Sequence, residues 1–146
     1  MKRSERQTPA PKTAGDESLE SKTAPRSKTV GDAAEERALS FLQARGLTVL
    51  TRNYRCRVGE IDVVARDNDA TLIFIEVRYR KTSRYGGAAA SVDRRKQQRI
   101  ARAASHYLQV HRINQATPCR FDVVAMGPGA ANIDWITGAF EVESWS

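Results

Sequence analysis

Two carboxylates stand inside otherwise apolar runs of the sequence. Asp62 interrupts the run from Ile61 to Val64, and Glu76 interrupts the run from Leu72 to Val77. An unpaired buried ion is strongly destabilising, so each acid needs a cationic partner or a metal. Two neighbouring carboxylates also raise each other's pKa unless a cation lies between them. The pair therefore indicates a site for a hard divalent cation such as Mg²⁺ or Mn²⁺, which prefers oxygen ligands.

The same two acids allow a second interpretation, a structural cluster of salt bridges. The cations available for that cluster are Arg78, Arg80 and Lys96. Spacing alone leaves both interpretations open.

The first predicted helix adds a third acid. Glu35 shares its side of the helix with residues three, four and seven positions later, which are Ala38, Leu39 and Leu42. Residues at these spacings form one helical face, so Glu35 is expected to face the core. The neighbouring Glu36 falls on the other side and is expected in solvent.

The second predicted helix carries a cation in a similar inward position. Lys96 is aligned with the apolar residues Val92, Ile100, Ala103 and Tyr107. Its stem can lie on the core while its ammonium group reaches toward the sheet. A separate stripe of this helix, well placed for phosphate, is formed by Arg95, Arg99 and Arg102.

Positive charge is concentrated in one segment. The net charge is +7, and residues 78–102 hold nine Lys or Arg against one Asp. Such a segment suits a polyanion, because phosphate contacts are electrostatic and independent of sequence. The alternative is a solvated helix face that keeps the protein soluble. On the first interpretation the nucleic-acid contacts are Arg80, Arg84, Arg95, Arg99 and Arg102.

Periodicity and turn residues predict the elements that position these side chains. Residues 32–45 have helical spacing and end at Gly46, a typical helix C-terminal glycine. Three strands follow at 47–55, 60–65 and 71–80, and they should form an antiparallel meander. If the second and third strands are neighbours, Asp62 and Glu76 can converge on one point.

Strand parity predicts which residues accompany the two acids. Asp62 should share its face of the second strand with Val64, and Glu76 should share its face of the third strand with Phe74 and Arg78.

A second helix is predicted from a Ser91 cap to about His111, with Asp93 in its first turn. Strand 121–126 is reached through this crossover helix and should be parallel to its neighbour. Residues 132–136 are a candidate edge strand. The order α-β-β-β-α-β predicts an α/β fold with a mixed sheet flanked by helices.

Length and composition limit the class of protein. The 146 residues favour one domain, at residues 30–146. Residues 1–29 are rich in Ser, Thr, Pro, Lys and Glu, which predicts a disordered basic tail. No apolar run approaches the roughly 18 residues that span a bilayer. Cys56 and Cys119 form no CxxC pair, which favours free thiols and a cytoplasmic location.

Several short motifs together resemble the YraN-like family of bacterial proteins. They are the Gly31-x-x-Ala34-Glu35 helix start, Gly59-Glu60-Ile61-Asp62, Ile75-Glu76-Val77-Arg78-x-Arg80, and Arg120-Phe121-Asp122-Val123. The resemblance covers about residues 31–126. This family is similar in turn to Holliday-junction resolvases and the D-(x)n-E-x-K nuclease superfamily. The resemblance thus implies a restriction-endonuclease-like αβββαβ core.

The resemblance also implies a Mg²⁺- or Mn²⁺-dependent endonuclease for structured or branched DNA. Asp62 and Glu76 would bind the metal together with the Val77 carbonyl, and Glu35 would hold a water at the metal. The metal would lower the pKa of that water and offset charge on the scissile phosphate. Resolvases cut two strands as dimers, so a homodimer is implied by analogy.

One residue departs from the superfamily pattern. Arg78 occupies the position of the superfamily lysine, and arginine effectively cannot lose a proton. Arg78 therefore suits electrostatic stabilisation of phosphate better than activation of water, and Lys96 is the candidate substitute. The candidate catalytic residues are Glu35, Asp62, Glu76, Arg78 and Lys96.

Three functions remain open on these grounds. The first is a metal-dependent nuclease, and the second is a nucleic-acid-binding protein that keeps the fold without catalysis. The third is a scaffold whose basic helix binds an acidic protein. Buried acids argue against the third, while Arg78 weakens the first relative to the second.

Overall fold

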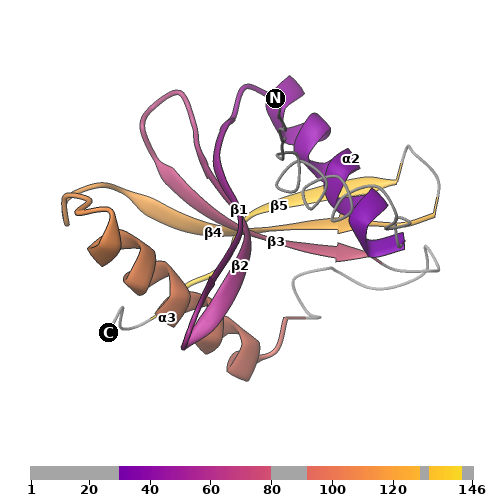
Figure 1. The fold of residues 1–146 in the computed structure, drawn as a ribbon. Coiled ribbons are helices and arrows are strands. Elements are labelled where there is room, and N and C mark those ends of the chain that lie inside the picture. The colour runs from indigo at the N-terminus through magenta and orange to yellow at the C-terminus, as the bar shows by residue number, and fades with distance from the viewer. Residues whose placement is uncertain (1–29, 80–91, 129–131, 143–146) are drawn as a thin grey trace, which may run out of the picture. The chain divides into compact units, whose positions relative to one another are not determined.

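The computed structural model describes residues 30–79, 92–128 and 132–142 (Figure 1). The predicted tail at residues 1–29 lies outside these ranges, as do Arg80, Arg84 and Ser91. For Val30 and Gly31 only the backbone is described.

A five-stranded mixed sheet forms the centre of the fold, in the order β1-β2-β3-β4-β5. The strands are β1 (Thr48–Cys56), β2 (Gly59–Arg66), β3 (Leu72–Tyr79), β4 (Cys119–Met126) and β5 (Ile133–Phe140). The first three make the predicted antiparallel meander, and β4 runs parallel to β3. The candidate edge strand is present as β5, antiparallel to β4 and longer than predicted.

Two helices cover opposite faces of the sheet, α2 (Val30–Ala44) and α3 (Arg94–Val110) (Figure 1). Gly46 follows α2 with φ of 95°, the left-handed conformation expected of a helix C-terminal glycine. The cap of α3 is Asp93 rather than Ser91, because Asp93 is extended and its carboxylate accepts the Lys96 N–H at 2.9 Å. The predicted α/β fold, a mixed sheet flanked by helices, is confirmed.

Each face of the sheet has its own apolar core. On the α3 side, Phe74 packs with Ile100 and Tyr107. On the α2 side, Ile75 packs with Leu42. Neither of the two described helices is long and apolar enough to span a membrane.

Candidate active site

Asp62 lies where β2 separates from β3. The antiparallel pairs between these strands end at Val63 and Ile75, so the next position along would set Asp62 opposite Glu76. Beyond this point a side chain of β2 bonds to the backbone of β3: Asp62 Oδ2 accepts a 2.8 Å hydrogen bond from the backbone N–H of Val77. The carboxylate of Asp62 is therefore directed along the sheet, toward the backbone of β3.

The alternation of side chains in β2 changes at the same place. Val63 packs on the α2 side and Val64 on the α3 side, yet Ile61 also packs on the α3 side. Asn53 of β1 lies between the pairs that flank Asp62, and its φ of 52° is left-handed. Strict alternation therefore fails between Ile61 and Val63, and the common face of Asp62 and Val64 stays a prediction.

Glu76 is buried on the α3 face of β3, with 5% of its surface exposed. Its Oε2 lies 3.3 Å from Nζ of Lys96 and 3.3 Å from a guanidinium nitrogen of Arg78. Helical spacing and strand parity thus placed both cations correctly. Because Lys96 belongs to α3 and Glu76 to β3, their ion pair links helix α3 to the central strand of the sheet.

The surroundings of Asp62 raise its pKa from the ordinary value to about 7. Burial is the largest cause, followed by the negative charge of Glu76, while the Val77 N–H opposes the shift. The charge of Glu35 raises this pKa further, and that of Lys96 lowers it. The pKa of Asp62 thus depends on charges from helices on both faces of the sheet.

Oxygen donors suited to a hard cation gather at this split between the strands. Asp62 and Glu76 supply two carboxylates. Val77 turns its N–H toward Asp62, and a strand residue presents its carbonyl on the same side as its N–H. Among the described residues, no three His, Cys, Asp or Glu side chains form an ion-holding group. Two carboxylates, a carbonyl and waters nevertheless fit Mg²⁺, which is commonly held by one or two carboxylates.

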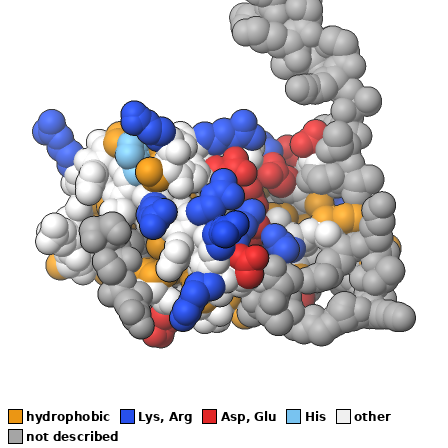
Figure 2. Space-filling model, turned by 90° about the horizontal axis from the view of Figure 1, so that it is seen from below, with side chains coloured by type: hydrophobic (Ala, Val, Ile, Leu, Met, Phe, Trp, Pro, Cys, Tyr) orange, Lys and Arg blue, Asp and Glu red, His pale blue; other side chains and the backbone are white. Residues whose placement is uncertain are grey.

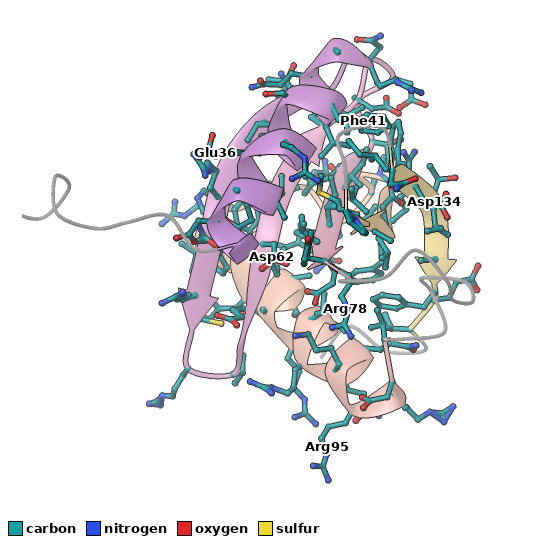
Figure 3. The ribbon with its side chains drawn as sticks, turned by 90° about the vertical axis from the view of Figure 1, so that its right-hand side faces the viewer. Glu36, Phe41, Asp62, Arg78, Arg95 and Asp134 are labelled. Carbon is teal, nitrogen blue, oxygen red and sulfur yellow. The ribbon has the colours of Figure 1, made fainter. Side chains whose placement is uncertain are left out.

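The predicted phosphate contacts on α3 lie in solvent. Arg95, Arg99 and Arg102 are exposed, and their spacing of four and three residues puts them on one helical face. Figure 2 shows Lys and Arg side chains gathered beside Asp and Glu side chains on one face of the molecule. In Figure 3, Arg95 extends away from the sheet, whereas Asp62 lies between the two helices.

A second buried acid escaped assignment from the sequence, where it appeared only within a family motif. Asp122 of β4 is fully buried. Its carboxylate accepts hydrogen bonds from Arg120 Nε at 3.0 Å, Trp135 Nε1 at 2.9 Å and the Gly138 N–H at 2.9 Å. The pairing of β4 with β5 shifts register between Phe121 and Val123. At this point the Asp122 carboxylate, rather than regular backbone pairing, makes hydrogen bonds to β5. The sequence feature that could have identified Asp122 is its position as an acid inside the apolar run from Phe121 to Met126.

Comparisons with known proteins decide the family. The profile of the Uncharacterised protein family UPF0102 matches residues 34–126. A UPF0102 protein of Cupriavidus pinatubonensis is 53% identical over 114 residues, which cover 78% of this chain and 87% of the relative. The chain belongs to the UPF0102 family. A UPF0102 protein of Methylococcus capsulatus is 51% identical over 77% of this chain and 91% of its own length. The bacterial family inferred from the motifs is thereby confirmed.

Two solved structures resemble part of the UPF0102 chain. A complex of EndoMS with double-stranded DNA matches with a TM-score of 0.38 and 20% identity, over 73% of this chain and 41% of that one. A repair endonuclease from Pyrococcus abyssi matches with a TM-score of 0.38 and 21% identity, over 73% and 43%. This chain therefore spans about two fifths of the length of either protein.

Proposed function

We propose that this UPF0102 protein is a divalent-metal-dependent endonuclease that hydrolyses phosphodiester bonds in structured or branched DNA. The observation that carries the proposal is the hydrogen bond of Asp62 to the backbone of β3 at Val77, next to Glu76, whose charge acts on Asp62. Like charges in a buried site disfavour folding, so a site that keeps them is a candidate for function. The exposed arginines of α3 supply the adjacent positive surface. We also propose that the protein is cytoplasmic and that it acts on two-stranded substrates as a homodimer.

Asp62, Glu76 and the Val77 carbonyl would hold Mg²⁺ or Mn²⁺. When bound, the metal supplies electrostatic stabilisation of the phosphate and a water of lowered pKa. Glu35 is half-buried on α2, and its charge acts on Asp62. A carboxylate in that position can accept a hydrogen bond from the attacking water and orient it.

Lys96 and Arg78 would stabilise negative charge on the scissile phosphate. Both lie 3.3 Å from Glu76 Oε2, so the carboxylate fixes their charged groups at the site. Arg78 would act by its charge alone. Because lysine side chains in general can exchange a proton and arginine side chains effectively cannot, Lys96 is the candidate of the two for acting on water.

The alternative is a nucleic-acid-binding protein that keeps the site without catalysis. One observation favours it: Glu76 is already bound by two cations of the chain itself. An acid paired in this way can serve the fold alone, as in the salt-bridge cluster considered from the sequence.

A cleavage and binding panel separates the two functions. Labelled four-way junctions, flaps, duplexes and single strands would be incubated with Mg²⁺ or Mn²⁺ and with wild type, Asp62→Asn or Glu76→Gln. The matched control is Glu36→Gln, because Glu36 is an exposed acid that pairs with Arg52 at 2.7 Å.

We expect metal-dependent cutting, strongest on junctions or flaps, that Asp62→Asn and Glu76→Gln abolish and Glu36→Gln retains. Cutting that persists in both site variants would refute the proposed site. Salt-sensitive binding without cutting, equal in all proteins, would establish the non-catalytic alternative. Sedimentation with a junction present tests the homodimer.

A further inference from the structure

We propose that the β1–β2 hairpin and helix α3 together form one track for the phosphate backbone of duplex DNA. The hairpin contributes Arg55 and Arg57, which lie beside Arg99 of the helix. The inference rests on the proposed function in one respect, namely that the ligand is nucleic acid. It adds a second element to the interface, since the sequence had pointed to the helix and to residues 80–84 only.

The hairpin is packed tightly against the helix. A Cβ atom on Gly59 would come within 2.5 Å of the backbone oxygen of Arg99, so only glycine allows this approach. Further along β1, Tyr54 packs edge-on against Tyr107 with ring centroids 5.1 Å apart. Arg99 and Tyr107 are about two helical turns apart. The hairpin backbone is therefore held at two points along α3, which keeps the attachment points of its arginines beside the helix before any ligand binds.

Positive charge dominates the junction between hairpin and helix. A pocket of about 290 Å³ is lined by Arg55, Arg57 and Arg99, with Glu60 as its acid. Glu60 pairs with Arg55 at 3.3 Å. Within the described residues, Arg57 and Arg99 form no ion pair, so their charges are available to an anion.

The arrangement fits a chain of phosphates better than a single anion. Arg95, Arg99 and Arg102 recur along one face of α3, and at about 1.5 Å per residue the stripe extends over roughly 10 Å. Arg55 and Arg57 of the hairpin lie beside this stripe at Arg99, so the positive surface is broader there. A linear and repeated set of cations matches the repeated charges of a nucleic-acid strand.

Salt dependence of binding tests the track without any need for cleavage. Fluorescence anisotropy of a labelled DNA duplex would be measured in EDTA over a range of KCl concentrations. The test variants are Arg55→Gln/Arg57→Gln and Arg99→Gln. The matched control, Arg45→Gln/Arg66→Gln, removes two exposed arginines that lie outside the track.

Each lost phosphate contact should reduce the slope of log K against log salt by about 0.9. We expect a reduction of roughly 1 to 2 in Arg55→Gln/Arg57→Gln, about 1 in Arg99→Gln and a markedly smaller one in the control. A hairpin variant whose slope matches wild type, or falls no more than the control, would overturn the track. Circular dichroism melting confirms that the variants fold.

These outcomes are separate from those of the cleavage panel. Duplex binding that is unaffected in the hairpin variant leaves the proposed nuclease intact while removing the track. A hairpin effect in a protein that cuts no substrate supports the track and removes the nuclease. Wild type that binds no duplex would overturn the track, while metal-dependent cutting of junctions or flaps in the panel would still support the nuclease.

Discussion

Nζ of Lys96 lies 3.3 Å from Oε2 of Glu76, so a cation from the first turn of α3 reaches a carboxylate buried in the central strand of the sheet. Lys96 is itself only half-buried, which leaves its amine accessible from the basic surface of α3. The contact therefore connects the buried acids to the exposed face where a phosphate would arrive.

Replacing Lys96 with methionine keeps most of the stem and removes the charge. Buried Glu76 then retains fewer cations, so the free energy of unfolding should fall by about 1–3 kcal/mol in urea titrations. Cleavage should fall on the order of 100-fold, as expected on losing one group that stabilises transition-state charge. Gln98→Met, at an exposed position of α3, is the control. Undiminished cleavage by Lys96→Met would exclude a catalytic role for the amine.

The raised pKa of Asp62 makes stability depend on pH. Because this pKa moves from 3.8 to about 7 on folding, the folded protein binds more protons than the unfolded chain between these values. The free energy of unfolding should therefore fall as pH rises through this window. Asp62→Asn cannot ionise but keeps an oxygen for the Val77 N–H, so it should flatten the dependence.

Above pH of about 7, Asp62→Asn should exceed wild type in stability by a few kcal/mol, since each unit of pKa shift corresponds to about 1.4 kcal/mol. Urea titrations of both proteins from about pH 4.5 to about pH 8.5, without divalent metal, measure the difference. Parallel curves at all pH values would show that Asp62 ionises normally in the fold.

Asp122 should prove essential to the fold. Asp122→Asn removes the charge that Arg120 contacts. It also replaces one of the two carboxylate oxygens, of which Oδ2 accepts from Trp135 and Oδ1 accepts from Gly138. Breaking such a buried pair costs about 3–5 kcal/mol, measurable by chemical denaturation. The control is Asp134→Asn, an exposed acid on β5. A loss no larger than in this control would mean that the carboxylate contributes little to the join between β4 and β5.

Local rules were sufficient for part of the site. Strand parity set Glu76 and Arg78 on one face, and helical spacing turned Lys96 toward the sheet, because these patterns depend only on residues a few positions apart. The antiparallel meander and parallel β4 followed from turn residues and the crossover helix in the same way.

Features that depend on distant parts of the chain could not be predicted. Asp62 accepts its hydrogen bond from the N–H of Val77, 15 residues away, and the left-handed Asn53 lies opposite Asp62 on the neighbouring strand. The partners of Asp122 on β5 are also remote, with Trp135 13 residues later in the chain. The hairpin arginines form no periodic stripe of their own, and only the packing of β1 and β2 on α3 brings them beside Arg99.

The capacity of the strand split to hold a divalent cation is tested most directly by titrating Mn²⁺ and following the free ion by electron paramagnetic resonance. We predict one Mn²⁺ site per chain in wild type and in Glu36→Gln, and its loss in Asp62→Asn/Glu76→Gln. Binding that is absent from wild type, or that survives unchanged in the double variant, would contradict the metal site.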